Sequence, residues 1–532
     1  MKARLSSTGK LRLRNGLLAL ALAGVATAPA EPTPTTPSDP PPVGDGSVVL
    51  TLVDIDKDQR LFQHVAGFYD VPVEGTTSGT SPVQARAIDA YTGAVVVDWT
   101  TIATPINGNY AGGLRCPKRI SPCKLEVRDS VNTASKKAGV NRFYVGVHGI
   151  IWGQSNAVNW PGGVYHYPNG GKGALVYKSG TFRRLGWILD TYPPSLERSG
   201  YGTGTTYPGG SATDNGGDKG DGFVYVANIL SEAIGCAVCL TVSASGGQPL
   251  SYWAPGATGW TELTAALAAI GGDAEFAVLY QGEADADGAS TTQSGYLAQL
   301  VARQTQFHNA TGRNASTFKF GVVGLGATNA NGTYADSMDK VRAAQIQFVN
   351  STPGAFLFAA NHDCRTSDGI HVNGSSYSHL GAAGGRTLAA LYGFGPSGAG
   401  PRVISASRVG PVIDMNVQHA GGTALLDGEG GTGAALKGFR VFLASDTNKT
   451  NELPQVSTGI PSATKIRVTL ASDPGAPIVI DYGMTPAPHS PDGISAQVEP
   501  VFASAVYDNV ALVNQVRGCI LQPFAAIAVT GS

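Results

Sequence analysis

The strongest constraint on the fold lies between residues 141 and 395, where apolar runs alternate with stretches of helical periodicity. Five runs have the length and side chains of buried strands: Phe143–Trp152, Cys236–Val242, Glu275–Tyr280, Phe318–Leu325 and Ala355–Ala360. The helical stretches between and after them are residues 223–234, 261–270, 296–307, 335–349 and 380–392. Continuous apolar strands alternating with helices predict a parallel sheet covered by helices on both faces.

The flanking segments have a different texture. Short runs rich in β-branched residues, such as Val83–Ile88 before the α/β region and Ile478–Tyr482 after it, are separated by Gly, Pro, Asn and Asp. We therefore predict a β-sandwich domain at residues 47–140, the α/β domain at residues 141–395 and a second β-sandwich domain at residues 396–532.

The first 46 residues have the composition of a leader and a linker. Residues 1–30 combine a basic, acid-free start, a short apolar run and small residues in an A-x-A pattern, which indicates a signal peptide or a retained N-terminal apolar segment. Residues 31–46 are proline-rich and predict an extended linker.

Composition excludes several classes of protein. A chain of 532 residues exceeds what one hydrophobic core usually supports, which agrees with several domains. The formal net charge of −1 argues against a nucleic-acid binder, which needs a basic face. Apart from the short N-terminal run, no segment is long and apolar enough for an ordinary membrane span.

The six cysteines are interpreted as structural. Cys116 and Cys123 flank a short basic segment and would suit a hairpin disulfide in an oxidising compartment. Cys236 and Cys239 match C-x-x-C but sit in an apolar strand, where their side chains would point to opposite faces. Without a second cysteine pair or a matching histidine pair, the pattern does not indicate zinc.

Residues with catalytic chemistry follow four of the predicted strands. Ser155 comes after Trp152-Gly153-Gln154, Gly246 and Gly247 follow the second strand, and Gln281 follows the third. After the last strand, Asp368 and His371 lie three residues apart, close enough for the carboxylate to orient the imidazole. Each feature alone also has an ordinary structural explanation, such as a helix-capping role for Ser155.

Taken together, these residues form the inventory for acyl transfer. In a parallel sheet the carboxyl ends of the strands meet at one edge, where such folds place their active sites. A hydroxyl, a glycine pair, a side-chain amide and an Asp-x-x-His pair would therefore converge there.

The same motifs resemble a known family. Gly-Gln-Ser-Asn at 153–156, Gly246-Gly247, Gln281-Gly282-Glu283 and Asp368-Gly369-Ile370-His371 are similar, in order and spacing, to the motif blocks of the SGNH/GDSL hydrolases, in the branch of sialate O-acetylesterase and related carbohydrate acetylesterases. The segment Val341–Gln345 also resembles that branch. The resemblance implies a three-layer α/β/α hydrolase domain.

The resemblance also implies roles for individual residues. Ser155 would be the nucleophile, His371 the general base and acid, and Asp368 the residue that orients His371, with Asp363 as a competitor. The oxyanion hole would consist of the Ser155 amide, the amide of Gly246 or Gly247, and the Gln281 side chain. The residues expected near the substrate are Gln154, Asn156, Glu283 and Trp253, with Trp152, Trp160 and Tyr252 as further aromatics that either stack on sugar rings or pack in the core. No metal or organic cofactor is expected.

The predicted function is removal of O-acetyl groups from carbohydrate, on sialic acid or a polysaccharide, by an exported serine esterase. An alternative is a virion tail-fibre or tailspike esterase acting on host surface glycan, which would be a homo-oligomer, expected as a trimer. A glycan-binding adhesin that has kept the fold is a third class, and the intact Ser155 and His371 argue against it.

Overall fold

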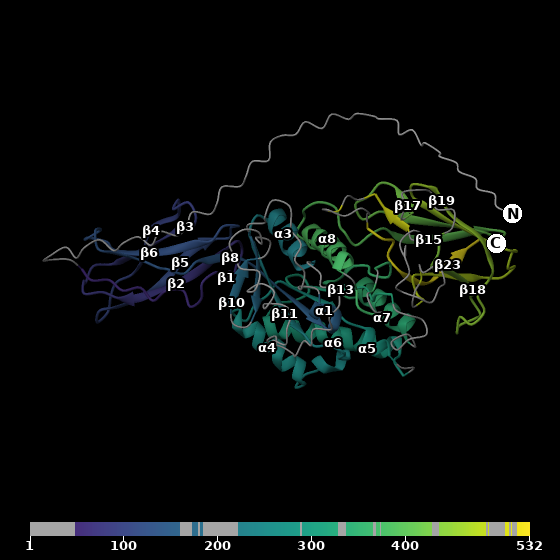
Figure 1. The fold of residues 1–532 in the computed structure, drawn as a ribbon, viewed down its shortest axis with the longest axis horizontal. Helices are drawn as coiled ribbons and strands as arrows, with labels where there is room; N and C mark the ends of the chain where they lie inside the picture. Colours follow the sequence, from purple (N-terminus) through teal and green to yellow (C-terminus); the bar gives the residue numbers. More distant parts are fainter. Residues whose placement is uncertain are drawn as a thin grey trace, which may run out of the picture. The chain divides into compact units, whose positions relative to one another are not determined.

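A computed structural model gives the fold of this chain (Figure 1). The residues that it describes are 48–159, 173–178, 181–184, 222–287, 290–327, 337–364, 366, 369–372, 374–427, 436–485, 488, 506–509, 512 and 519–531. The predicted leader at residues 1–30 and linker at residues 31–46 lie outside the described residues.

The predicted parallel sheet is present. Its five strands are β8 (Phe143–Gly153), β11 (Ala237–Ala244), β12 (Phe276–Tyr280), β13 (Lys319–Val323) and β14 (Ala355–Ala359). They lie in the order β11-β8-β12-β13-β14, and every neighbouring pair is parallel. Beyond β11 the sheet continues with β9 (Ala174–Lys178), parallel to β11, and β10 (Thr181–Arg184), antiparallel to β9.

Helices cover both faces of this sheet, as the alternation of strands and helices predicts. On one face, α3 (Gly222–Ile234) and α8 (Gly374–Leu391) pack in a core that contains Ile151. On the other face, α4 (Thr258–Ala269), α6 (Gln293–Thr311) and α7 (Met338–Ser351) pack in a core that contains Trp152. Because Ile151 and Trp152 are neighbours in β8, their side chains point to opposite faces, which makes a three-layer α/β/α arrangement (Figure 1).

The strands before β8 are joined to the α/β sheet. β1 (Arg60–Gln63) pairs in parallel with the start of β8, and β6 (Cys123–Asp129) pairs with Phe143 at its first residue. The remaining strands of this part are β2 (Phe68–Thr76), β3 (Val83–Asp89), β4 (Val95–Ala103), β5 (Asn109–Pro117) and β7 (Lys136–Ala138). β2 and β5 form a separate two-stranded sheet, and one buried cluster contains apolar residues of both sheets.

The strands after α8 form a seven-stranded sheet in the order β18-β21-β23-β15-β16-β20-β19, and β17 and β22 pair separately. Their bounds are β15 (Arg402–Val409), β16 (Val412–Gln418), β17 (Leu425–Asp427), β18 (Phe439–Leu443), β19 (Gln455–Ser462), β20 (Lys465–Leu470), β21 (Ile478–Tyr482), β22 (Val506–Asp508) and β23 (Phe524–Thr530). We call residues 402–531 the C-terminal β region. Val48–Ser532 forms one compact unit; the sandwich form of both flanking regions and their boundaries at residues 140 and 395 stay predictions.

All six cysteines are buried, and Cys116 and Cys123 form no disulfide in this structure. Cys236 and Cys239 belong to the two different cores on either side of the parallel sheet, which confirms that their side chains point to opposite faces. Burial raises the pKa of Cys236 to about 12. A thiol held in its neutral form is a poor nucleophile, which agrees with a structural role.

No helix among the described residues is long and apolar enough to cross a membrane.

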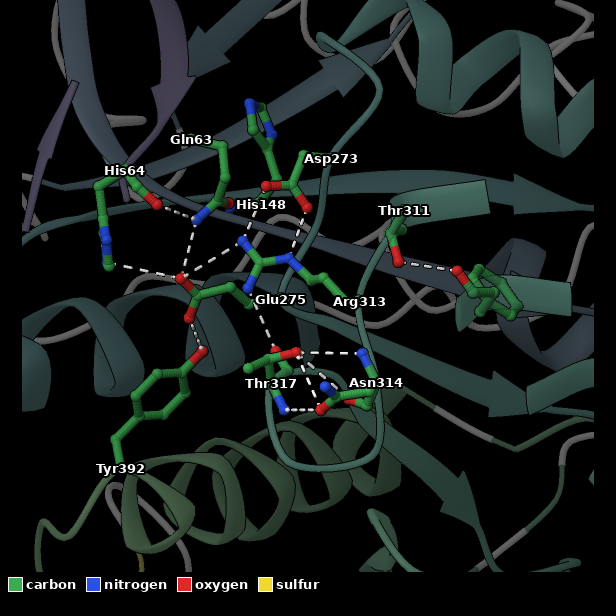
Figure 2. Close-up of polar contacts among 11 residues, drawn as sticks. Gln63, His64, His148, Asp273, Glu275, Thr311, Arg313, Asn314, Thr317 and Tyr392 are labelled. Atoms are coloured by element: carbon green, nitrogen blue, oxygen red, sulfur yellow. Dashed lines mark hydrogen bonds and ion pairs between the residues drawn. The ribbon is translucent and has the colours of Figure 1, made fainter. Parts of the chain in front are cut away.

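A polar cluster fastens the first strands to the amino end of the parallel sheet (Figure 2). Gln63 donates a hydrogen bond of 2.9 Å to Glu275 and accepts one of 2.6 Å from the His148 amide. Glu275 also accepts from the Tyr392 hydroxyl at 2.6 Å and lies 3.6 Å from His64. The cluster thus ties the segment after β1 to the sheet at the end opposite to the one that carries Ser155.

His148 in this cluster makes the stability of the fold depend on pH. Its imidazole is fully buried and lies 3.0 Å from the Leu61 carbonyl oxygen. Burial, reinforced by the charge of Arg60, lowers the pKa of His148 from 6.5 to about 4, against the opposing effects of that hydrogen bond and of Asp273. The unfolded chain therefore binds the proton more tightly, and the stability contributed above pH 6.5 is lost as the pH falls towards 4.

We expect the free energy of unfolding to fall by about 2 kcal/mol between pH 7 and pH 5 through His148 alone. Urea unfolding at the two pH values measures this fall. In His148→Gln, which has no titrating ring, the fall should be smaller by that amount. An equal fall in both proteins would contradict the assignment.

Candidate active site

The candidate site begins where three parallel strands end side by side. In the register of the sheet, Gly153 at the end of β8 pairs with Ala244 of β11 on one side and with Tyr280 of β12 on the other. The sequence motifs follow these three residues directly. The sheet therefore brings Ser155, Gly246 and Gln281 to one edge, as the sequence predicts.

Gly153 sets the turn that presents Ser155. Its φ of +138° lies in a region that favours glycine, and a β-carbon built on it would lie 2.0 Å from the Tyr280 carbonyl oxygen. The chain therefore turns sharply out of β8 and enters the short helix α1 (Ser155–Asn159) at once. Ser155 opens this helix and is 8% exposed.

Ser155 and His371 are brought together across 216 residues of chain. His371 Nε2 lies 2.9 Å from Ser155 Oγ, which is hydrogen-bond distance. An imidazole in this position can take the hydroxyl proton as the oxygen attacks a carbonyl carbon. Asp368, predicted to orient His371, lies outside the described residues.

The glycine pair lies beside the serine. A β-carbon at Gly246 would be 3.9 Å from Ser155 Cβ, so the Gly246 backbone faces Ser155 without contact from a side chain of its own. Gly247 has a φ of +68° and open space around its α-carbon. This placement suits the predicted backbone donors of the oxyanion hole, the amides of Ser155 and Gly246 or Gly247.

Gln281 departs from its predicted role as an oxyanion donor. Its side chain is fully buried, and its amide nitrogen donates to Asp285 Oδ2 at 2.5 Å, with the Gln248 carbonyl and Gln154 Oε1 at 3.2 and 3.3 Å. Its oxygen accepts from the Tyr296 hydroxyl at 2.8 Å. Since the amide has only two hydrogens, both are already used. Gln281 thus stabilises the loop after β12. The sequence could not show that its amide hydrogens already have acceptors within the protein.

The four residues predicted to contact substrate are buried instead. Gln154, Asn156 and Glu283 are at most 2% exposed, and Trp253 has no exposed surface. Gln154 Oε1 accepts from the Ala284 amide at 3.1 Å, so it holds the turn after β12. These side chains therefore belong to the protein interior behind the site.

The aromatic residues near the motifs do not supply the predicted stacking surface. Trp253 packs edge-on against Trp152 at a centroid distance of 5.5 Å, and both rings lie in the core below the sheet. Trp160 lies outside the described residues, and Tyr252 is partly exposed. The two buried tryptophans therefore pack in the core and do not stack on sugar rings.

Asn156 is the residue that holds the His371 loop against the serine. Its amide nitrogen donates to Glu283 at 2.6 Å and to the Ile370 carbonyl at 3.3 Å, while its oxygen accepts from the Val372 amide at 3.1 Å. Asn156 thus hydrogen-bonds to Ile370 and Val372, the residues on both sides of His371. Tyr377 of α8 completes the contact by donating to the same oxygen at 2.8 Å, a role that no sequence signal indicated.

Glu283 places a carboxyl group behind this contact. Burial raises the pKa of Glu283, against the opposing effects of the Asn156 hydrogen bond and the charge of His371. Its second oxygen is buried and has no hydrogen-bond partner among the described residues.

We expect Asn156→Ala to lower kcat of ester hydrolysis by roughly 100-fold. Without the hydrogen bonds of Asn156 the loop that carries His371 would shift, and His371 Nε2 would move away from Ser155 Oγ. Steady-state kinetics with an aryl acetate measure the change. Asn228→Ala is the matched control, since Asn228 is equally buried and bonds only within α3, to Val224. An equal loss in both variants would show that Asn156 acts on general stability alone.

Comparison with known proteins identifies the domain around this site. Residues 213–390 match the family model of the carbohydrate esterases described as sialic acid-specific acetylesterases. This chain therefore contains a segment similar to the esterase domain of that family. It is therefore a carboxylic ester hydrolase, and the matched residues include Gly246, Gln281 and His371. Ser155 lies before the matched segment, so its part in the site depends on the geometry described above.

A solved structure supports the fold. A carbohydrate acetylesterase from Xanthomonas citri is similar over 90% of this chain and 99% of its own, with a TM-score of 0.55 and 17% sequence identity. A carbohydrate acetylesterase from Sinorhizobium meliloti shares 15% identity over 46% of this chain and 99% of its own, with a TM-score of 0.28. No curated protein matches the chain.

Proposed function

We propose that this esterase removes O-acetyl groups from carbohydrate, on sialic acid or an acetylated polysaccharide, through an acyl-enzyme formed on Ser155. The observation that carries the proposal is the 2.9 Å contact between Ser155 Oγ and His371 Nε2 at the carboxyl edge of the sheet. The matching family of carbohydrate esterases supports the acetyl group and the carbohydrate as the substrate class.

In the first half of the proposed reaction, Ser155 Oγ attacks the acetyl carbonyl carbon while His371 Nε2 takes the hydroxyl proton. The resulting oxyanion accepts hydrogen bonds from the backbone amides of Ser155 and Gly246 or Gly247. Each such donor is worth roughly 3–4 kcal/mol of barrier. The tetrahedral intermediate then collapses to acetyl-Ser155, and His371 returns its proton to the departing sugar oxygen.

In the second half, water attacks acetyl-Ser155. His371 takes a proton from this water and gives it back to Ser155 Oγ as acetate leaves. Asp368, three residues before His371, is the proposed orienting carboxylate. The near-neutral net charge of −1 agrees with a substrate that is held by hydrogen bonds more than by ion pairs.

A screen for acetate release over O-acetylated glycans tests the substrate class. The panel contains O-acetylated sialic acid, acetylated xylan and an aryl acetate, each with its deacetylated counterpart as the blank. We expect acetate from at least one glycan. Cleavage of the aryl acetate with no release from any acetylated glycan would contradict the carbohydrate part of the proposal.

We further propose that the protein acts outside the cytoplasm. The basic start, apolar run and small residues of the first 30 residues support export. N-terminal sequencing of the protein from its native host would test this. A mature terminus near Glu31 supports export, whereas an intact Met1 favours the virion tail protein predicted as the alternative.

A further inference from the structure

Arg342 of α7 connects the α/β domain to the C-terminal β region. Its guanidinium is 1% exposed and donates to backbone carbonyls only. Two of these belong to the loop after β13, Leu325 at 3.1 Å and Gly326 at 2.5 Å. The other two follow β21, Gly483 at 2.8 Å and Thr485.

Burial of the charged Arg342 guanidinium is unfavourable unless all four carbonyl oxygens keep their hydrogen bonds to it. Burial lowers the pKa of Arg342 to about 9, because the charged guanidinium loses its hydration inside the protein. No carboxylate accepts a hydrogen bond from it among the described residues. Its charge is thus compensated by carbonyl dipoles from two segments, and moving either segment would leave a buried donor unpaired.

The loop that carries His371 contacts the C-terminal β region as well. This loop follows β14, and the Tyr507 hydroxyl of β22 donates to Asp363 Oδ2 at 2.6 Å, with both residues at most 2% exposed. His362 packs edge-on against Tyr482 at a centroid distance of 5.5 Å. Asp363, the competitor for the orienting role, thus bonds to Tyr507.

A second side chain of α7 extends the connection to the motif after β12. Gln345 lies one helical turn after Arg342 and donates to the Gln281 carbonyl at 3.1 Å, while its oxygen accepts from the Leu325 amide at 2.8 Å. The segment Val341–Gln345, which resembles the acetylesterase branch in sequence, therefore contacts both the motif after β12 and the C-terminal β region.

We propose that the C-terminal β region positions the catalytic histidine, with Tyr507 and Arg342 as positioning residues for the reaction of Ser155. This inference rests on the proposed function. Tyr507 fixes Asp363, eight residues before His371, and Arg342 fixes the neighbouring loop after β13. Asn156 holds the other end of the His371 loop. The position of the imidazole therefore depends on one contact from the α/β domain, made by Asn156, and one from the C-terminal β region, made by Tyr507.

The test compares Tyr507→Phe with Tyr110→Phe. Both tyrosines are at most 3% exposed, and each hydroxyl donates to one oxygen, Asp363 Oδ2 for Tyr507 and the Thr51 carbonyl for Tyr110. Tyr110 lies among the first β strands. The measurements are kcat and KM with an aryl acetate, the rate at which a fluorophosphonate labels Ser155, and the thermal midpoint.

For Tyr507→Phe we expect kcat and the labelling rate to fall together by about 10-fold, with KM within about twofold, because the base moves while the binding surface does not. Tyr110→Phe should keep its kcat although its midpoint falls. A kcat within about twofold of wild type for Tyr507→Phe, or an equal loss in Tyr110→Phe, would overturn the inference.

If Tyr507→Phe does not fold, Asp363→Asn supplies the same measurement. An amide oxygen still accepts from Tyr507 but without the strength of a charged acceptor, so kcat should fall by about threefold at unchanged KM. An unchanged kcat would overturn the inference. Failure of the proposed function is distinguishable, because the wild-type protein would then release no acetate and Ser155 would not be labelled.

Discussion

Replacing Ser155 by Ala should lower kcat for acetate release by roughly 10⁴- to 10⁶-fold, the loss seen when a serine hydrolase is deprived of its nucleophile. Without Oγ no acyl-enzyme forms, and only slow attack by water on the bound ester remains. The measurement is acetate release from an aryl acetate at saturating substrate. The fold should survive, because Ser155 is the first residue of a short helix and its hydroxyl bonds to His371.

Ser231→Ala is the matched control for this variant. Ser231 is a buried serine of α3 in the same domain, and its hydroxyl donates to the Cys236 carbonyl at 2.7 Å. Its removal costs stability without touching the site, so kcat should stay close to wild type. A Ser155→Ala protein that releases acetate at the wild-type rate would disprove the acyl-enzyme mechanism on Ser155.

Replacing His371 by Ala should reduce kcat by a factor on the order of 10⁴ or more, since the variant lacks the base that lies 2.9 Å from the hydroxyl of Ser155. The sharper expectation concerns the double variant Ser155→Ala/His371→Ala. Residues that act as a unit are strongly non-additive, so the double variant should be no slower than the slower single variant.

His308→Ala is the control, because His308 of α6 packs on Phe318 away from the strand ends. Its kcat should match that of the wild type. Losses that multiply in the double variant would show that Ser155 and His371 act independently, which is incompatible with proton transfer between them.

Much of the fold could be predicted from local pattern. The five apolar runs became β8, β11, β12, β13 and β14 because each is buried on both faces, which leaves a continuous apolar signature. Among the strands before β8 the signal was weaker: β2 alternates exposed and buried residues and was not predicted. Its partner β5 carries two glycines and was missed too.

The sequence also placed Ser155 and His371 correctly at the ends of strands, since the topology of a parallel sheet makes the carboxyl ends of its strands meet. It could not distinguish side chains that face the substrate from side chains that support the site. Gln281, Asn156 and Trp253 have the chemistry of substrate contacts, yet each is buried and bonded or packed to the protein.

The sequence by itself thus determined the order of strands and helices, the residues at the strand ends and the class of reaction they can perform. Only the tertiary structure decided that Asn156 holds the His371 loop and that Tyr507 joins this loop to the C-terminal β region. The same is true of Arg342, which joins the loop after β13 to that region. The physical reason is that strand and helix periodicity are local properties of the chain. The partner of a buried hydrogen-bonding group lies up to 221 residues away and depends on how the elements pack.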